Sequence, residues 1–285
     1  MNKEDYFIKQ IANQKYIGDD GAYIDGYVYS MDSFFENNHF KKEWVDKKIF
    51  TFKKLAYKSM LVNISDAIAM NAKPKYALLS VAIPKTYSKK DLKSLAKGFK
   101  KAEKKFGFKI IGGDTIENVK LDISITIISK TKNPIFRNRL LKDDLLCYTG
   151  TLGESKRDLE KLLRGETISK KSKFIKPKLK AEFFYEASKY INSSMDISDG
   201  LFFELERLSK QNSLGFEFFE KIDESIGISG EEYELLFSFS EENRSKIEEI
   251  AKKHKVKLNI FAKAIDGSYK NSYENHHFKK SKDKN

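Results

Sequence analysis

The chain has 285 residues, and 54 lysines and arginines against 41 aspartates and glutamates give it a formal net charge of +13. Hydrophobic residues make up 40% of the chain, which excludes wholesale disorder, and the length predicts about two domains. No segment approaches the roughly 18 apolar residues of a membrane helix, and the polar first ten residues lead us to expect no signal peptide.

The single cysteine, Cys147, excludes an internal disulfide and a multi-cysteine zinc site. That composition fits a reducing compartment, so we expect a soluble, cytoplasmic protein without a membrane partner. The lysines are scattered in short runs without an aromatic binding motif, which favours a solvated surface over a nucleic-acid partner. The alternative for these lysines is attraction of anionic ligands, including phosphates.

The first half of the chain alternates strands and amphipathic helices. A strand is predicted at 27–34, followed by a helix at 55–72 with Leu61, Ile64 and Ile68 on one face. Asn71 stands where a left-handed cap would end that helix, and Pro74 prevents its continuation. The almost wholly apolar run at 76–83 predicts a strand buried on both faces.

A second amphipathic helix is predicted at 88–106, with a capping box of Ser88 and Asp91 and an end at Gly107. A short strand at 109–111 is expected to run into a turn at 112–114. An alternating strand at 121–128 follows.

A polar stretch at 131–144 separates this region from a second one, where the pattern restarts. Strands are predicted at 145–150, 214–219, 233–239 and 258–265, and helices at 154–163, 177–191, 200–211 and 241–254. Because strands and helices do not alternate strictly, the α+β class is favoured over a doubly wound sheet. We expect domains at 1–136 and 137–278 and a disordered tail at 279–285.

Several familiar catalytic motifs are absent from the sequence. There is no P-loop, no histidine-rich metal cluster and no Gly-x-Ser-x-Gly elbow. What remains are aspartates among small residues, in the segments 18–21, 30–32, 63–66, 112–115 and 195–200. One such aspartate is an ordinary turn residue. Five segments together predict hard oxygen ligands for Mg²⁺, with several ions neutralising a polyphosphate.

The segments 16–22, 55–74, 111–115, 195–201 and 230–237 carry a family resemblance. They resemble thiamine-monophosphate kinase in order and spacing, over the chain from about Lys15 to Phe278. The resemblance implies a phosphotransferase that makes thiamine diphosphate from thiamine monophosphate and ATP. It also implies the two-domain fold shared with aminoimidazole ribonucleotide synthetase and selenophosphate synthetase, in which the N-terminal ATP- and Mg-binding sheet domain forms a homodimer and the C-terminal α+β domain closes over the site.

The resemblance also implies roles for individual residues. The Mg²⁺ ligands would be Asp20, Ser30, Met31, Asp32, Asp66, Asp114, Asp196 and Asp199. The ATP contacts would be Gly113, Asp114, Arg137 and Ser198. The substrate contacts would be His39, Glu231 and Tyr273. Met31 replaces the family's usual threonine, so it would bind metal through its backbone carbonyl. Tyr273 would stack on thiamine, and Asn275 is the gap-free alternative at that position.

No protein side chain is expected to act as a general base, because the attacking phosphate is already ionised near neutral pH. Two alternatives remain open. One is another ATP-using enzyme of the superfamily, similar to aminoimidazole ribonucleotide synthetase, although the segments 63–66 and 230–235 favour the thiamine enzyme. The other is a basic nucleic-acid-binding protein, which would bind DNA or RNA in a salt-sensitive manner. A selenophosphate synthetase would need a reactive cysteine near the N-terminus, where this chain has none.

Overall fold

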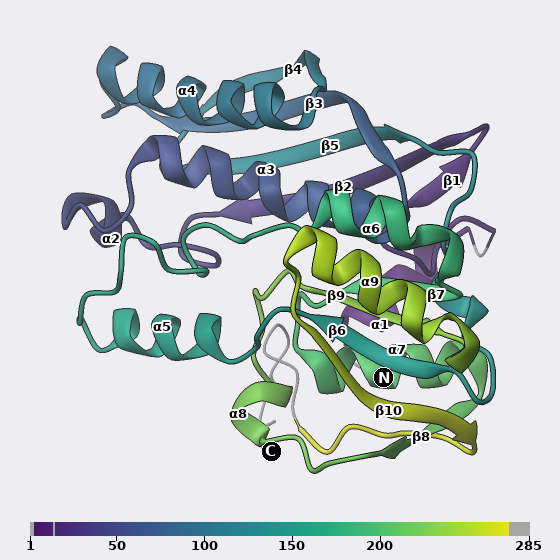
Figure 1. Ribbon diagram of the computed structural model, residues 1–285. Helices are drawn as coiled ribbons and strands as arrows, with labels where there is room; N and C mark the ends of the chain where they lie inside the picture. The colour runs from purple at the N-terminus through teal and green to yellow at the C-terminus, as the bar shows by residue number, and fades with distance from the viewer. Residues whose placement is uncertain (1–2, 14, 274–285) are drawn as a thin grey trace.

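The computed structural model describes residues 3–13 and 15–273, so Asn275 and the predicted tail lie outside the described residues. Two five-stranded sheets form the scaffold, with strand orders β1-β2-β5-β3-β4 and β7-β9-β6-β10-β8 (Figure 1). The predicted α+β class is confirmed. Within the described part of the chain, no helix is long and apolar enough to cross a membrane.

The first sheet comes from residues before 131. Its strands are β1 (Ala22–Ile24), β2 (Tyr27–Phe35), β3 (Lys73–Pro84), β4 (Lys109–Asn118) and β5 (Asp122–Lys130). Only the β3–β4 pair is parallel. Helices α3 (Phe52–Ala69) and α4 (Lys89–Phe106) lie along one face (Figure 1). Helices α1 (Lys3–Ile11) and α2 (Lys42–Asp46) complete this half.

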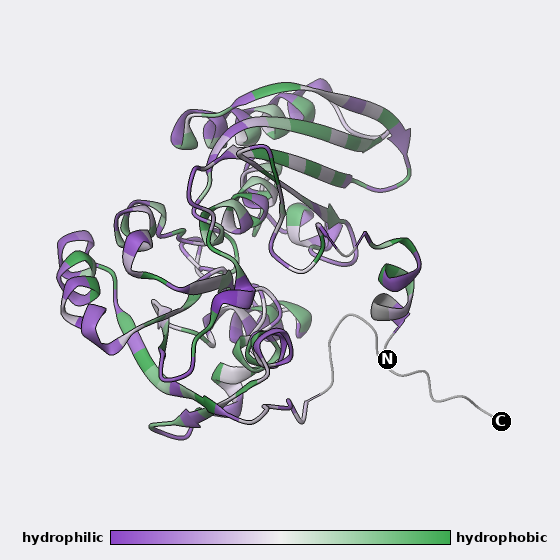
Figure 2. Ribbon diagram, turned by 90° about the vertical axis from the view of Figure 1, so that its right-hand side faces the viewer, coloured by the Kyte–Doolittle hydropathy of each residue, from purple (hydrophilic) through white to green (hydrophobic). Residues whose placement is uncertain are grey.

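Hydropathy alternates along the strands of this sheet (Figure 2). Ile123, Ile125 and Ile127 of β5 are fully buried in the core beneath α3. The opposite face is open and carries exposed apolar side chains, among them Tyr29, Met31, Tyr76, Leu78 and Ile116. One face of the sheet therefore forms the core and the other faces outward.

The helix ends follow local chemistry. Thr51 caps α3 by accepting from the amide of Lys54, and Asn71 takes the expected left-handed conformation after its last turn (φ 54°). The helix thus begins and ends three residues earlier than predicted. In α4, the capping box of Ser88 and Asp91 and the left-handed Gly107 (φ 72°) are both confirmed.

The second sheet comes from residues 145–266. Its strands are β6 (Leu145–Thr149), β7 (Ser193–Asp196), β8 (Leu214–Phe218), β9 (Leu235–Phe239) and β10 (Leu258–Asp266). Its helices are α5 (Glu154–Leu163), α6 (Ala181–Ala187), α7 (Leu201–Asn212), α8 (Glu224–Gly227) and α9 (Arg244–His254). Three short 3₁₀ turns lie at η1 (Arg137–Arg139), η2 (Ser188–Tyr190) and η3 (Glu241–Asn243).

Three further sequence-based boundaries were wrong. Residues 112–114 continue β4 instead of turning, because the β3–β4 ladder runs on to Asn118. Gly113 (φ 146°) permits this, since a Cβ there would lie 1.7 Å from the Leu79 carbonyl oxygen. Strand β9 begins at Leu235 because Tyr233 has a left-handed backbone (φ 51°). Helix α6 is confined to Ala181–Ala187, followed by η2.

The two halves meet along α3. The Ser194 hydroxyl of β7 donates to the carbonyl of Ala69, and the Tyr185 hydroxyl donates to the carbonyl of Ala72 (2.9 Å). These bonds hold β7 and α6 beside the C-terminal end of α3. Asp196, the last residue of β7, therefore faces Asp66 of α3.

Candidate active site

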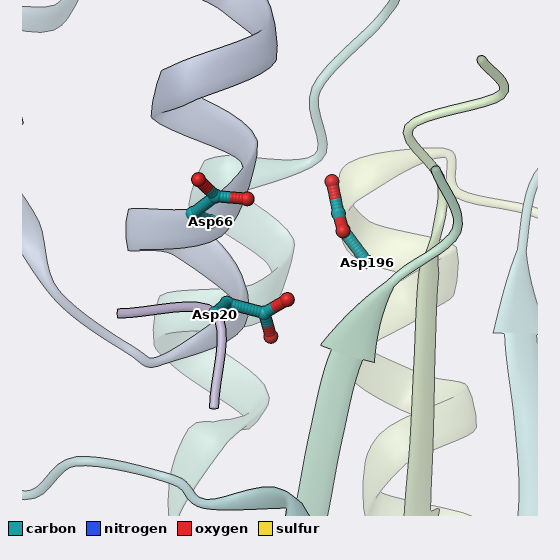
Figure 3. Close-up of side chains that lie close together, drawn as sticks. All are labelled: Asp20, Asp66 and Asp196. Atoms are coloured by element: carbon teal, nitrogen blue, oxygen red, sulfur yellow. The ribbon is translucent and has the colours of Figure 1, made fainter. Parts of the chain in front are cut away.

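Three carboxylates from distant parts of the chain converge at this junction (Figure 3). Asp20 comes from the loop before β1, Asp66 from α3, and Asp196 from the last position of β7. One oxygen from each lies within 4.8 Å of the other two. This separation is short enough for a single cation to bind all three.

Neighbouring polar groups hold these carboxylates in place. Arg137 donates from its guanidinium to Asp20, and its backbone amide donates to Asp19 Oδ1 (2.6 Å). The Ser65 hydroxyl bonds the carboxyl of Asp196. Asp19 thus fixes the turn that brings Arg137 to Asp20.

Asp32 joins the cluster from β2. Its amide donates to Asn63 Oδ1 (2.8 Å), and its side chain shares a hydrogen bond with Asp66. The hydroxyl of buried Ser30 donates to the carbonyl of Asn63 (3.4 Å). Ser30 and Asp32 are two residues apart on one strand, so both face α3.

The electrostatics of the cluster are unfavourable for unbound carboxylates. Burial raises the pKa of Asp32 to about 6. Burial, and then the neighbouring aspartates, raise the pKa of Asp66 and of Asp196 well above the ordinary range. Burial also raises the pKa of Asp20, against the opposing effect of Arg137. Each carboxylate therefore resists ionisation in the absence of a cation.

Two oxygens of the cluster, Asp20 Oδ2 and Asp196 Oδ2, are buried with no hydrogen-bond partner among the described residues. An unpartnered buried carboxylate oxygen is costly unless a ligand compensates. A hard divalent cation prefers such oxygen donors. The residues present thus fit Mg²⁺.

Asp199 lies beyond the cluster in the loop after β7, and basic and acidic groups of α7 contact it. Arg207 donates to Asp199 Oδ2 (2.5 Å) and to Glu204 Oε2 (2.5 Å). The buried Glu204 accepts in turn from the Asp199 amide (3.0 Å) and from the Ser198 hydroxyl (3.5 Å). The predicted ATP contact Ser198 and the predicted metal ligand Asp199 thus belong to one network.

Gly113 and Asp114 lie apart from the cluster, and so does the side chain of Met31. The Met31 side chain is 64% exposed on the open face of the first sheet, but its backbone, which would supply the predicted carbonyl ligand, joins Ser30 to Asp32 in β2. Asp114 is exposed in the edge strand β4, paired with Ser80, which is paired with Ser124 of β5. Because paired residues share a face and Ser124 is paired with Ser33, Asp114 lies on the open face, away from Asp32. Gly113 precedes it in the same strand.

The predicted substrate residues fall into two places. His39 stacks on Phe34 (ring centroids 5.3 Å apart), and Phe34 also lies near Lys58, whose Nζ is 2.5 Å from Glu231 Oε2. His39 and Glu231 therefore border one region. Tyr273 stacks on Phe202 at the start of α7, with centroids 5.6 Å apart and planes 8° from parallel.

The loop that carries Glu231 is tied to the segment after Asp196. The amide of Glu231 donates to the Ser198 carbonyl (2.6 Å), and the amide of Tyr233 donates to the Ile197 carbonyl (2.8 Å). Burial raises the pKa of Tyr233 well above its ordinary value, and Glu231 and Asp32 raise it further. Tyr233 is therefore close enough to both Glu231 and the carboxylates to be affected by their charges.

Sequence reasoning missed several residues of this site. They are Lys58, Ser65, Glu204, Arg207 and Tyr233. Glu204 and Arg207 are three residues apart on a helix, a spacing that predicts an ion pair. Lys58 carried no such local signal, because its partner is 173 residues away.

The family model described as AIR synthase related protein, N-terminal domain, matches residues 18–131. Residues 18–131, which supply the first sheet together with Asp20 and Asp66, accordingly match the AIR-synthase-related class of domains. The chain is 35% identical over 280 residues to the thiamine-monophosphate kinase of Buchnera aphidicola subsp. Schizaphis graminum, covering 87% of this chain and 84% of that protein. It is 34% identical over 206 residues to the Pyrococcus horikoshii enzyme of the same name, covering 67% of each. The chain belongs to the thiamine-monophosphate kinase family.

Solved structures agree on the fold. A ThiL structure in complex with AMPPCP and TMP superposes with a TM-score of 0.81 at 23% identity, covering 93% of this chain and 90% of that one. Thiamine monophosphate kinase from Aquifex aeolicus superposes with a TM-score of 0.79 at 22% identity, covering 93% and 94%. The hydrogenase maturation protein HypE of E. coli has a TM-score of 0.69 at 14% identity, covering 93% and 91%.

Proposed function

We propose that this chain phosphorylates thiamine monophosphate to thiamine diphosphate with ATP, and that its carboxylate cluster holds Mg²⁺ between the two anionic reactants. The observation that carries the proposal is the convergence of Asp20, Asp66 and Asp196 within 4.8 Å, with two buried oxygens unpartnered among the described residues. Membership of the thiamine-monophosphate kinase family supports the choice of substrate.

Phosphoryl transfer between two anions needs positioning and charge neutralisation more than covalent assistance. Bound Mg²⁺ would supply that neutralisation. Asp20, Asp66 and Asp196 would hold the ions, with Asp32, Ser30 and Asp199 as further ligands. Arg137 and Ser198 border the same aspartates, which supports their predicted contacts with ATP. No general base is assigned, because the acceptor phosphate is already ionised.

We also propose that the chain acts as a homodimer through the open face of the first sheet. Met31, Tyr29 and Ile116 expose 64%, 40% and 55% of their surfaces there. An uncovered sheet face with exposed apolar side chains favours a protein interface. Because Gly113 and Asp114 lie in the edge strand of this sheet, we assign their predicted nucleotide contacts to the site of a second copy. A monomer in sedimentation at micromolar concentration would contradict the dimer.

A cytoplasmic location is part of the proposal, supported by the buried free thiol of Cys147.

The test of activity is incubation of the purified protein with Mg-ATP and thiamine monophosphate, followed by chromatographic detection of thiamine diphosphate. Asp32→Asn should abolish turnover while keeping the free energy of unfolding within ~1 kcal/mol of wild type. ATP consumption with aminoimidazole ribonucleotide precursors, but none with thiamine monophosphate, would favour the superfamily alternative. Salt-sensitive binding to DNA or RNA without ATP turnover would favour the nucleic-acid alternative.

A further inference from the structure

A lysine of α3 is completely buried at the junction of the two halves. The side chain of Lys58 has no exposed surface, and its Nζ lies 2.5 Å from Glu231 Oε2. Two aromatic rings cover the same ammonium group, Phe174 at 3.8 Å and Phe34 at 5.7 Å from their centroids. A helix of the first half and a loop of the second are thereby joined by one ion pair.

Such a lysine is not required for packing. Burial lowers the pKa of Lys58, and Glu231 opposes that shift. Replacing a buried ion pair by apolar groups of similar volume is often neutral or stabilising. A methionine is of similar length, so packing beside Phe34 and Phe174 does not by itself require an ammonium group. The ammonium group of Lys58 is therefore explained by its ion pair with Glu231 and not by packing.

Both the backbone and the side chain of Glu231 are held by neighbouring residues. Its backbone is left-handed (φ 55°), a conformation that a glutamate seldom adopts, and its amide donates to the Ser198 carbonyl (2.6 Å). Its carboxylate reaches Lys58, yet 23% of the side chain remains exposed. Glu231 can therefore contact a ligand, whereas Lys58 cannot.

The surroundings of Glu231 indicate which part of a ligand it contacts. His39 stacks on the Phe34 ring that lies near the Lys58 ammonium. Lys58 precedes Asp66 by eight residues on α3, which corresponds to about 12 Å along the helix axis. A substrate with its phosphate at the carboxylate cluster would reach this region with its organic end.

We propose that Lys58 is a positioning residue for the substrate: it holds the Glu231 carboxylate toward the organic end of thiamine monophosphate and sets affinity for that substrate without contacting it. The inference rests on the proposed function of the site. It assigns no part to Lys58 in ATP binding or in phosphoryl transfer.

The test compares Lys58→Met, Lys58→Gln, Lys58→Arg and Glu231→Gln with wild type. Lys53→Met is the matched control, because Lys53 is an exposed residue of the same helix. For each protein, KM is measured separately for thiamine monophosphate and for ATP. Thiamine monophosphate binding is measured by calorimetry in the presence of Mg²⁺ and a non-hydrolysable ATP analogue. The fluorescence of Trp44, the chain's single tryptophan, reports on local packing because it lies 6.0 Å from Phe174.

We expect Lys58→Met and Glu231→Gln each to weaken thiamine monophosphate binding about tenfold, the value of a charge-assisted hydrogen bond, with KM for ATP within about twofold of wild type. The double variant should be no weaker than Glu231→Gln alone, because both changes remove one interaction. Lys58→Arg should restore part of the affinity, and Lys53→Met should behave as wild type.

Wild-type affinity for thiamine monophosphate in folded Lys58→Met overturns the inference. So does an equal loss of affinity for ATP and thiamine monophosphate, or an additive double variant. If Lys58→Met does not fold, Lys58→Gln decides: wild-type affinity in that variant also overturns the inference. Absence of thiamine diphosphate with the wild-type protein is a separate result, and it overturns the proposed function first.

Discussion

Two groups of carboxylates, one within the second half and one at the junction of the two halves, differ in their partners. Glu232 and Glu234 share Lys173, whose Nζ is 2.7 Å from Glu232 Oε2 and 2.8 Å from Glu234 Oε1. All three side chains are at most 7% exposed. In the other group, no lysine or arginine of the described residues forms an ion pair with Asp66 or Asp196.

Hydrogen bonds repeat this difference. Glu232 Oε1 accepts from the amides of Gly153 (2.8 Å) and Ser155 (3.1 Å) and from the Ser229 hydroxyl (2.6 Å). Its Oε2 lacks a well-directed hydrogen bond but has the Lys173 ammonium beside it. Asp196 Oδ2 has neither a hydrogen bond nor such a cation among the described residues.

The comparison separates structure from function among buried and half-buried acids. A buried carboxylate is stable when the chain supplies its own cation, and then it ties segments together. A buried carboxylate without one is stabilised only by protonation or by a ligand. Glu232 and Glu234 therefore belong to the scaffold, whereas Asp66 and Asp196 belong to the site.

The largest effect is expected for Asp66→Asn. Removal of one charge from the cluster should lower turnover about a thousandfold, as loss of a central electrostatic contact does. The protein without ligand should be as stable as wild type or more stable by about 1 kcal/mol, because repulsion with Asp32 and Asp196 is relieved. Melting with and without Mg-ATP tests this, since the variant should lose most of the ligand-induced shift. Full retention of that shift would exclude a bridging role for Asp66.

Glu232→Gln should have the opposite consequence. It leaves the Lys173 ammonium buried without one of its anions, which should destabilise the fold by about 3 kcal/mol. The shift in melting temperature caused by Mg-ATP should be unchanged. Urea unfolding measures the loss, and Glu249→Gln is the control because Glu249 makes only an exposed pair with Lys246. Equal stability of Glu232→Gln and wild type would contradict the structural assignment.

The pH dependence of folding stability should distinguish the two groups of carboxylates less strongly than these two substitutions do. Burial raises the pKa of Asp32 to about 6, so the folded protein binds that proton more tightly than the unfolded chain does. The stability from this group is therefore complete below the ordinary aspartate pKa and is lost as the pH rises through about 6.

Metal binding requires the ionised carboxylates. The stabilisation by Mg-ATP should therefore be smaller at about pH 5.5 than at about pH 8, and melting curves at the two pH values measure it. Glu232→Gln should keep this dependence, and Asp66→Asn should weaken it. A ligand-induced shift independent of pH would show that the carboxylates are ionised before the ligand binds.

Sequence reasoning found what local chemistry determines. The α4 caps and the left-handed Asn71 follow from short-range preferences, and the structure has both. Asp20, Asp66 and Asp196 were grouped through the resemblance of whole motifs, and they converge in the structure. The hydrophobic periodicity of a segment predicts that one face of the helix or strand is buried, but it does not predict which segment covers that face.

The missed features depend on long-range contacts. Nothing near Lys58 in the sequence indicates Glu231, and the strand through Gly113 continues only because β3 lies beside it. The predicted strand at 233–239 begins two residues late because the left-handed Tyr233 has its amide bound to the Ile197 carbonyl. In each case the deciding partner is distant along the chain.

The smallest effect is expected for Tyr273→Ala, because Tyr273 belongs to neither group of acids. Its ring stacks on Phe202, and Tyr273 is 37% exposed, so we expect it to be accessible to an aromatic ligand. Loss of that stacking should weaken thiamine monophosphate binding by roughly 1 kcal/mol while leaving ATP affinity and the pH dependence of Mg-ATP stabilisation unchanged. Tyr273→Phe should bind as wild type, because the ring is retained. Calorimetry with both ligands measures the difference, and an unchanged affinity for thiamine monophosphate in Tyr273→Ala would assign recognition of the thiamine ring to another aromatic side chain.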